Sequence, residues 1–209
     1  MTSKTLAALL LVASSTTAAF ADDYELGARV GGYGFRRQDA DGQWDVCRMN
    51  GFGVFGGRAL RGPLFVEAGI DMYSSIGAAQ PTDLPIDRTS GLFSGAIGAR
   101  TQLATWLRGY VQLGGGVELT RVSVPYGDDH IRDEKAMPEG FFGLGFDIKL
   151  AKHTLVGSSF RTLLMGNFDY DPANLEMKDQ WAWKPTPDVV FDASPDVATQ
   201  VQFYVRHEL

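Results

Sequence analysis

The stretch from Thr89 to Val124 constrains the fold most, because it predicts two long β-strands with only Ala104-Thr105 between them. On both sides of that connection apolar or small residues alternate with polar ones, which is the period of a strand with two different faces. The apolar or small positions are Phe93, Gly95, Ile97, Ala99 and Leu103, followed by Leu107, Gly109, Val111, Leu113, Gly115, Val117 and Leu119. An ordinary strand has about 5 to 6 residues, whereas a tilted strand that crosses a bilayer needs about 9 to 11. The length of these strands therefore predicts that they cross a membrane.

Residues 1–21 have the pattern of a secretory signal peptide. Lys4 precedes an apolar run from Leu6 to Val12, and small residues then lead to a cleavage site of the A-x-A type at Ala19 and Ala21. The apolar run is shorter than the roughly 20 residues of a membrane-spanning helix, and no later segment offers a second candidate. We therefore expect residues 22–209 to form one barrel domain that meets the membrane with strands.

Cysteine usage agrees with a closed sheet. The chain contains 1 cysteine, Cys47, which excludes an intramolecular disulfide and is best interpreted as a bystander. Small exported folds with little core usually depend on disulfides. We expect a closed ladder of backbone hydrogen bonds to hold this one instead.

Alternation along the whole chain predicts eight strands. They are Tyr24 to Arg37, Val46 to Leu60, Pro63 to Ser74, Thr89 to Leu103, Trp106 to Val124, Met137 to Leu150, Thr154 to Phe168 and Val197 to Leu209. The connections after the even strands are very short, and those after the odd strands are longer and polar, including Pro125 to Ala136 and Asp169 to Asp196. Short periplasmic turns and long surface loops are typical of bacterial outer-membrane barrels. The sequence therefore predicts an all-β fold, an eight-stranded antiparallel up-and-down transmembrane β-barrel with both termini at the short-turn end.

The two faces of the predicted strands differ in chemistry. Apolar side chains dominate one face, at Leu64, Val66, Ala68, Ile70 and Met72, at Phe142, Leu144, Phe146, Ile148 and Leu150, and at Val201, Phe203, Val205 and Leu209. The other face holds six acids and six bases, which we call the lumen charge network: Glu25, Glu67, Asp71, Glu118, Asp147 and Glu208 with Arg29, Arg100, Arg108, Lys149, Arg161 and Arg206. Equal numbers permit pairing, which a low-dielectric interior requires. Aromatic residues near strand ends, namely Tyr24, Tyr73, Trp106, Tyr126 and Phe168, predict interfacial girdles.

With this pattern the chain resembles the small eight-stranded outer-membrane barrels of the OmpA transmembrane domain and OmpX type. The resemblance covers residues 22–209 and implies a location in the bacterial outer membrane, contact with outer-membrane lipid and recognition by the barrel-insertion machinery. In that family the last strand alternates apolar residues and ends in an aromatic. Here Val201, Phe203 and Val205 keep the alternation, whereas His207 and the terminal Leu209 depart from it. We expect no peptidoglycan-binding domain after the barrel, so the resemblance does not imply an anchoring role.

Two barrel enzymes of similar size, lipid A deacylases and palmitoyltransferases, use a histidine with a serine, so the histidines of this chain are candidate catalytic bases. The candidate groups are His153 with Ser158 or Ser159, and His130 with Asp128 and Asp129. His153 is expected in a short periplasmic turn, His130 in a loop and His207 on the outer face. Ordinary turn, loop and surface histidines are the favoured interpretation, so we expect no catalytic residue, no metal site and no cofactor.

The segment from Asp169 to Asp196 is rich in acids and contains Trp181 and Trp183. Clustered carboxylates can bind Ca²⁺, but the spacing lacks the order and the glycine of an EF-hand. We interpret the segment as a solvated acidic loop that packs on its own barrel or contacts an unidentified surface partner.

Function is less constrained than architecture. An eight-stranded lumen is filled by side chains or holds one small ligand, so a salt-bridged interior is favoured over a ligand cavity or a porin-like ion path. The net charge of −6 argues against nucleic-acid binding. We therefore expect a non-enzymatic role in envelope structure or in surface interaction through the loops. The alternatives are a small-ligand carrier that is lipocalin-like or OmpW-like, and a lipid A or phospholipid-modifying enzyme.

Overall fold

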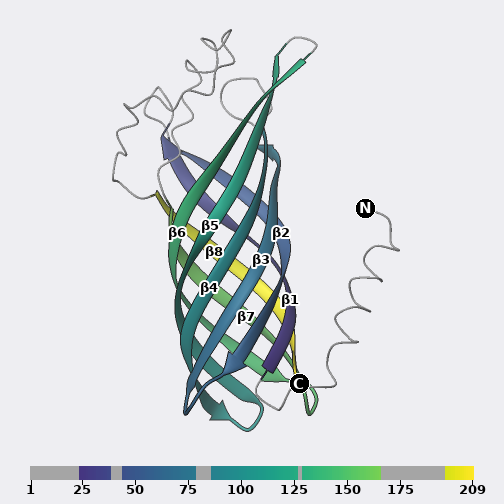
Figure 1. Cartoon of the computed structure of the whole chain (residues 1–209), viewed down its shortest axis with the longest axis vertical. Coiled ribbons are helices and arrows are strands. Elements are labelled where there is room, and N and C mark those ends of the chain that lie inside the picture. Colours follow the sequence, from purple (N-terminus) through teal and green to yellow (C-terminus); the bar gives the residue numbers. More distant parts are fainter. Residues whose placement is uncertain (1–23, 39–43, 79–85, 127–128, 166–195) are drawn as a thin grey trace, which may run out of the picture.

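The computed structural model describes residues 24–38, 44–78, 86–126, 129–165 and 196–209. These residues form eight antiparallel strands in a closed barrel (Figure 1). The strands are β1 (Tyr24–Gln38), β2 (Trp44–Ala59), β3 (Leu64–Ala78), β4 (Ile86–Ala104), β5 (Leu107–Tyr126), β6 (Asp129–Lys149), β7 (Thr154–Met165) and β8 (Asp196–Glu208). Each strand pairs with its sequence neighbours, and β1 closes the barrel on β8 from Glu25↔Glu208 to Phe35↔Ala198. The predicted fold class is confirmed.

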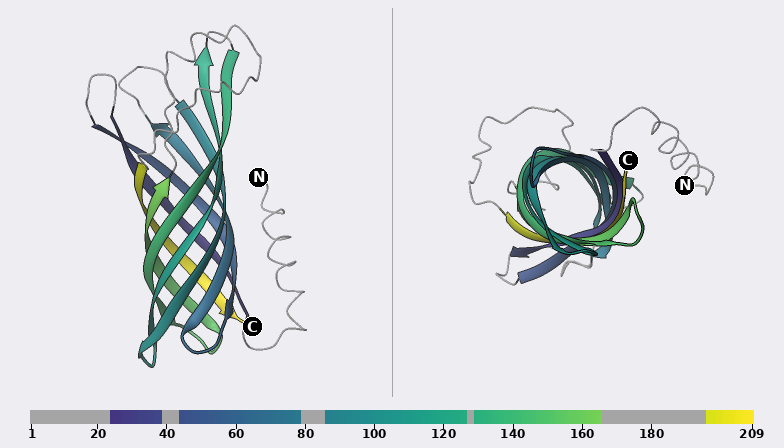
Figure 2. Two further views of the ribbon diagram at one scale, coloured as in Figure 1. Left: turned by 60° about the vertical axis from the view of Figure 1, so that its left-hand side comes forward. Right: turned by 90° about the horizontal axis from the view of Figure 1, so that it is seen from below.

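The closed ring is seen when the barrel is viewed along its axis (Figure 2). The first and last strands begin and end at the same end of the barrel, where the Leu209 amide donates to the Tyr24 carbonyl over 2.9 Å. No helix in the described ranges is long and apolar enough to cross a membrane.

The short turns lie where the alternation predicts them. In the β2–β3 turn the Leu60 amide donates to the Leu64 carbonyl (2.8 Å), and in the β6–β7 turn the Leu150 amide donates to the Thr154 carbonyl (3.0 Å). Gly62 in the first of these turns has φ +68°, a left-handed conformation that residues with a Cβ rarely adopt. The sequence places its glycine where the backbone requires one.

The β5–β6 connection differs from the prediction. Pro125 to Ala136 was expected to be a loop, but β5 and β6 stay paired as far as Tyr126↔Asp129, and Pro125 pairs with His130. Arg121 and Glu134 face each other across this extension, with Nε to Oε1 at 2.6 Å. Residues 125–136 do not alternate apolar and polar side chains in sequence, so the pattern that revealed the other strands is missing here. β2, β3 and β4 are also longer than predicted at their loop ends, whereas residues 166–168, expected to end β7, lie outside the described residues.

The outer wall is apolar. Leu64, Val66, Ile70 and Met72 on β3 are all exposed, as are Phe142, Leu144, Phe146 and Leu150 along β6 and its turn, and Val201, Phe203 and Val205 on β8. In a soluble protein so many exposed apolar side chains would aggregate, so this face is suited to lipid.

The girdle prediction was wrong for Tyr73. Its side chain is 4% exposed and lies in the lumen, where its hydroxyl accepts hydrogen bonds from Gln200 (2.8 Å) and Gln202 (3.2 Å). Trp106, in the β4–β5 turn, is 56% exposed, and Tyr24 stacks on Arg58 with the guanidinium carbon 5.1 Å from the ring centroid. The side chains of Tyr126 and Phe168 lie outside the described residues.

Candidate functional site

The lumen contains most of the charged side chains that the strands bury, and it is the candidate site. Two clusters of apolar side chains divide it. The cluster towards the short turns consists of Phe55, Phe65, Tyr110 and Tyr204. The cluster towards the loops consists of Tyr33, Met49, Tyr73, Leu92, Met137, Phe141, Leu163, Met165 and Ala198. Charged groups lie among both clusters, so each of them needs a partner inside the barrel.

Arg29 on β1 makes a two-pronged ion pair with Asp71 on β3. Its Nε and Nη2 each donate over 2.6 Å, to Oδ1 and Oδ2 respectively. The intervening strand contributes Gly53, which pairs with Arg29 on one side and with Asp71 on the other. A Cβ at Gly53 would overlap the Asp71 carboxylate. The glycine therefore lets two charged residues meet across the strand that separates them.

Glu67 connects this pair to the far wall. Its Oε1 accepts from Arg29 Nη1 over 2.9 Å and from Arg161 Nη2 on β7 over 3.2 Å. The Arg161 guanidinium lies 4.6 Å from the centroid of the Phe141 ring. One carboxylate thus ties β1, β3 and β7 together through the interior.

A second group of ion pairs lies nearer the short turns. Arg206 on β8 donates to Glu25 Oε2 over 2.8 Å, and Arg100 on β4 donates to Glu25 Oε1. Arg108 on β5 binds Asp147 Oδ2 and Glu208 Oε1, each at 3.0 Å. Asp147 also accepts a hydrogen bond from the Tyr204 hydroxyl (2.7 Å). The contacts of Arg100 with Glu25 and of Arg108 with Glu208 cross the interior between strands that are not neighbours in the ring.

Acidic groups towards the loop end have different partners. Glu118 Oε1 accepts from the Tyr33 hydroxyl and from Thr120 Oγ1, each over 2.8 Å. Glu139 is 7% exposed, and within the described part of the chain neither of its carboxylate oxygens has a hydrogen-bond partner. Glu118 pairs with Met137, two residues before Glu139 on the same face, so the two carboxylates are diagonal neighbours.

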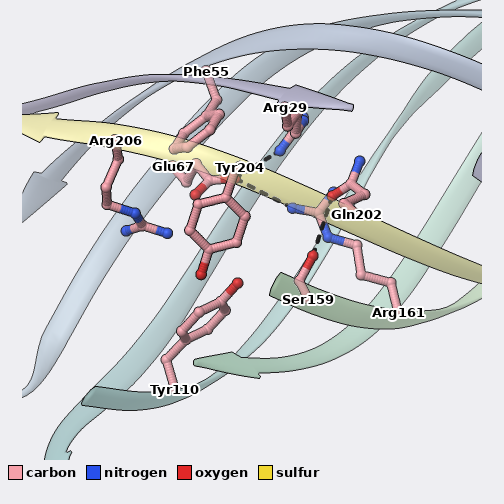
Figure 3. Close-up of a pocket in the computed structure, with 9 residues that line it drawn as sticks. All are labelled: Arg29, Phe55, Glu67, Tyr110, Ser159, Arg161, Gln202, Tyr204 and Arg206. Carbon is pink, nitrogen blue, oxygen red and sulfur yellow. Dashed lines mark hydrogen bonds and ion pairs between the residues drawn. The ribbon is translucent and has the colours of Figure 1, made fainter. Parts of the chain in front are cut away.

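The space between these side chains is narrow. Nine residues line it around Arg161 and Tyr204, on the inner face of the barrel (Figure 3). Between them there is essentially no volume, about 0 Å³, that the centre of a water molecule can occupy. The Arg206 guanidinium lies 4.8 Å from the centroid of the Tyr204 ring and 5.4 Å from that of Phe55. Aromatic rings therefore occupy the space between the charged groups. At this level the lumen is a packed interior with no room for a solute.

Eleven of the twelve residues proposed for the lumen charge network make ion pairs or hydrogen bonds inside the barrel. Lys149 is the exception, because it is exposed at the end of β6, where the strand leaves the barrel. Glu139 was missed, although it shares the alternation of Asp147 on β6 and could have been found by extending it. The tyrosine partners Tyr33, Tyr73 and Tyr204 were also missed, since alternation assigns a face but not a partner.

The candidate catalytic groups do not form a hydrolase-like arrangement where they are described. His153 lies at the end of the β6–β7 turn, and its ring centroid is 6.1 Å from that of His207. Ser159 is buried and donates to Gln202 Oε1 over 3.3 Å, and Ser158 alternates with it on the opposite face of β7. The side chain of His130, like the acidic loop with Trp181 and Trp183, lies outside the described residues.

Comparison with known proteins agrees with this geometry. A family model described as "Outer membrane protein beta-barrel domain" matches residues 5–178. No curated protein matches the chain in sequence. Among solved structures, Neisserial surface protein A (NspA) has a TM-score of 0.56 and 11% identity, with 90% of this chain and 98% of that chain covered.

Two further solved structures are similar at lower scores. Ail, the attachment invasion locus protein of Yersinia pestis, has a TM-score of 0.48 and 14% identity, covering 88% of this chain and 97% of that one. The N-terminal β-barrel domain of Pseudomonas aeruginosa OprF has a TM-score of 0.46 and 11% identity, covering 88% and 97%. The family match, the closed ring of strands and the apolar outer wall lead to one conclusion: the chain belongs to the outer membrane protein β-barrel family and is a bacterial outer-membrane protein.

Proposed function

We propose that this barrel is a non-enzymatic scaffold of the outer membrane that presents the extracellular β5–β6 hairpin and the neighbouring loops to partners at the cell surface. The observation that carries the proposal is the contrast between the packed interior of the barrel and its extended loop end. The described lumen around Arg161 is packed without space for water, whereas the β5–β6 hairpin extends beyond the other strands (Figure 1).

The outer part of the β5–β6 hairpin projects beyond its neighbouring strands. β6 pairs with β7 only from Glu139 onwards, so residues 129–138 pair with β5 alone among the described strands. Its described cross-strand pair, Arg121 with Glu134, is 58% and 65% exposed. β5 pairs with β4 as far as Ser123, so only the part of the hairpin beyond Ser123 and Arg132 is a two-stranded ribbon. A two-stranded ribbon is marginal by itself, but here the barrel wall holds its base. Loops and ribbons on a rigid scaffold are a common place for binding residues.

The experiment compares whole cells that display two forms of the protein. In the test variant, residues 124–131, which lie beyond the last pair of β5 with β4, are replaced by Asn-Gly, which closes the hairpin at Ser123 and Arg132 with a tight turn. The matched control exchanges the charges of the exposed pair, Arg121→Glu with Glu134→Arg, and keeps the hairpin length. Both are scored for adhesion to a panel of immobilised glycans and extracellular proteins, after a heat-modifiability gel has shown that each is folded.

We expect the shortened variant to lose adhesion to at least one surface that the wild type and the length-matched control bind. Equal adhesion of all three proteins to every surface that the wild type binds would refute a role for the hairpin. A change in lipid A or phospholipid composition that depends on the wild-type protein would instead establish the enzyme alternative.

A further inference from the structure

Two histidines that are far apart in the sequence meet at the short-turn end of the barrel. His153 ends the β6–β7 turn and His207 lies on β8, and their ring centroids are 6.1 Å apart with planes inclined at 48°. Both side chains are exposed. The scaffold function proposed above does not use either of them.

The backbone holds the two residues in place. Thr154, directly after His153, pairs with His207, and the Glu208 amide donates to the His153 carbonyl over 2.8 Å. The Thr154 hydroxyl lies 3.5 Å from His207 Nδ1. A hydroxyl beside Nδ1 favours metal binding through the other ring nitrogen, Nε2, because outer-shell partners on one nitrogen orient the imidazoles of metal sites.

The separation of the rings suits one metal ion between them. A metal–nitrogen bond of about 2.0–2.1 Å places each imidazole centroid about 3 Å from the ion, so two rings on opposite sides have centroids about 6 Å apart. The observed 6.1 Å is close to this arrangement. Imidazoles on opposite sides fit the tetragonal geometry of Cu²⁺, which also binds nitrogen ligands more tightly than the neighbouring divalent metals.

We propose that His153 and His207 form a two-histidine binding site for a divalent transition metal, with Cu²⁺ bound in preference to Zn²⁺. Groups of three or more metal-binding side chains are not found among the described residues, so water completes the coordination and the ion exchanges readily. The Glu208 carboxylate is held by Arg108 at 3.0 Å, and Lys152 precedes His153 in the exposed turn. Nearby positive charge makes this a site of moderate affinity.

The test uses the mature full-length barrel, folded in detergent and free of any histidine tag. Cu²⁺ is titrated against a competing chelator, and the bound ion is examined by electron paramagnetic resonance, which reports the coordinating nitrogens. The variants are His153→Gln, His207→Gln and Thr154→Val. His130→Gln is the matched control, because it removes the third histidine of the chain, which lies on β6 at the other end of the barrel.

We expect one Cu²⁺ per wild-type protein with two imidazole nitrogens, and the same result for His130→Gln. Loss of either site histidine should weaken binding by at least about tenfold, the lower limit for loss of an outer-shell partner, and should remove one nitrogen from the spectrum. Thr154→Val should weaken binding less than either. Wild-type affinity in His153→Gln or His207→Gln, a signal lost only in His130→Gln, or tighter binding of Zn²⁺ than Cu²⁺ would overturn the proposal as stated.

Discussion

Replacing Arg29 by methionine tests the ion-pair network at a fully buried pair. The side chains of Arg29 and Asp71 are 3% and 1% exposed, and both carboxylate oxygens of Asp71 accept from Arg29. Arg29→Met therefore leaves a buried carboxylate without its cation. Removing one partner of a buried pair destabilises proteins by about 3–5 kcal/mol, and we expect a loss of unfolding free energy in that range.

Two further variants distinguish the cost of leaving one charge unpaired from the cost of removing the whole ion pair. Asp71→Asn leaves Arg29 with its 2.9 Å contact to Glu67, so we expect a smaller loss of about 1–3 kcal/mol. The double variant Arg29→Met with Asp71→Leu removes both charges and fills the space with apolar groups. Since such replacements are often neutral or stabilising, we expect it to be more stable than Arg29→Met alone.

The assay is urea unfolding of the mature barrel in lipid vesicles, followed by tryptophan fluorescence and by the folded band on an unheated gel. Lys149→Met is the matched control, because Lys149 is exposed, and it should change stability by less than about 0.5 kcal/mol. Arg29→Met within that same margin of the wild type would refute the reasoning. So would a double variant as unstable as the single one.

Three further pairs of variants are each expected to differ in their effect on the unfolding free energy. Glu139→Gln should leave the unfolding free energy unchanged or raise it by about 1 kcal/mol, because both oxygens of the buried carboxylate lack a partner among the described residues. Glu25→Gln, which weakens two arginine contacts, should lower the unfolding free energy, and urea titration of both variants decides. Gly53→Ala should destabilise the barrel by about 1–3 kcal/mol because its Cβ overlaps Asp71, and Gly91→Ala, which has open space, should be tolerated; equal midpoints in urea would contradict this. Leu113 is exposed on the apolar outer wall in the interior of β5, so Leu113→Lys should lower stability in vesicles by about 2–4 kcal/mol. Val197→Lys, near the loop end of β8, should have a smaller effect, and equal losses would contradict a dependence on depth in the bilayer.

Alternation was enough to predict the strand count and the assignment of faces, because a strand with a lipid side and a lumen side has a period of two residues. It placed Arg29, Glu67 and Asp71 on one face without showing that Gly53 lets Arg29 reach Asp71. That pairing depends on the register of three strands, which cannot be predicted from the alternation. The β5–β6 extension was missed because residues 125–136 do not alternate apolar and polar side chains. Tyr73 was assigned to a girdle from its position near a strand end. However, it lies two residues after Asp71 on β3, so the alternation already placed both side chains on the lumen face.

The contact of His153 with His207 could not be predicted either, because it follows from the closure of β7 on β8 and from the path of a turn. The number of residues between His153 and His207 does not indicate that they meet. The same holds for Arg108 with Glu208, which join β5 to β8 across the barrel.

The central claim is that the barrel is a closed scaffold, and electrical recording tests it most directly. The mature protein, shown to be folded by its heat-modifiable band, is inserted into a planar lipid bilayer at neutral pH. We predict no ion current above that of the bare bilayer, because the side chains around Arg161 leave no space for water. Reproducible unitary conductance steps from the wild-type protein would contradict the account and establish a conducting lumen.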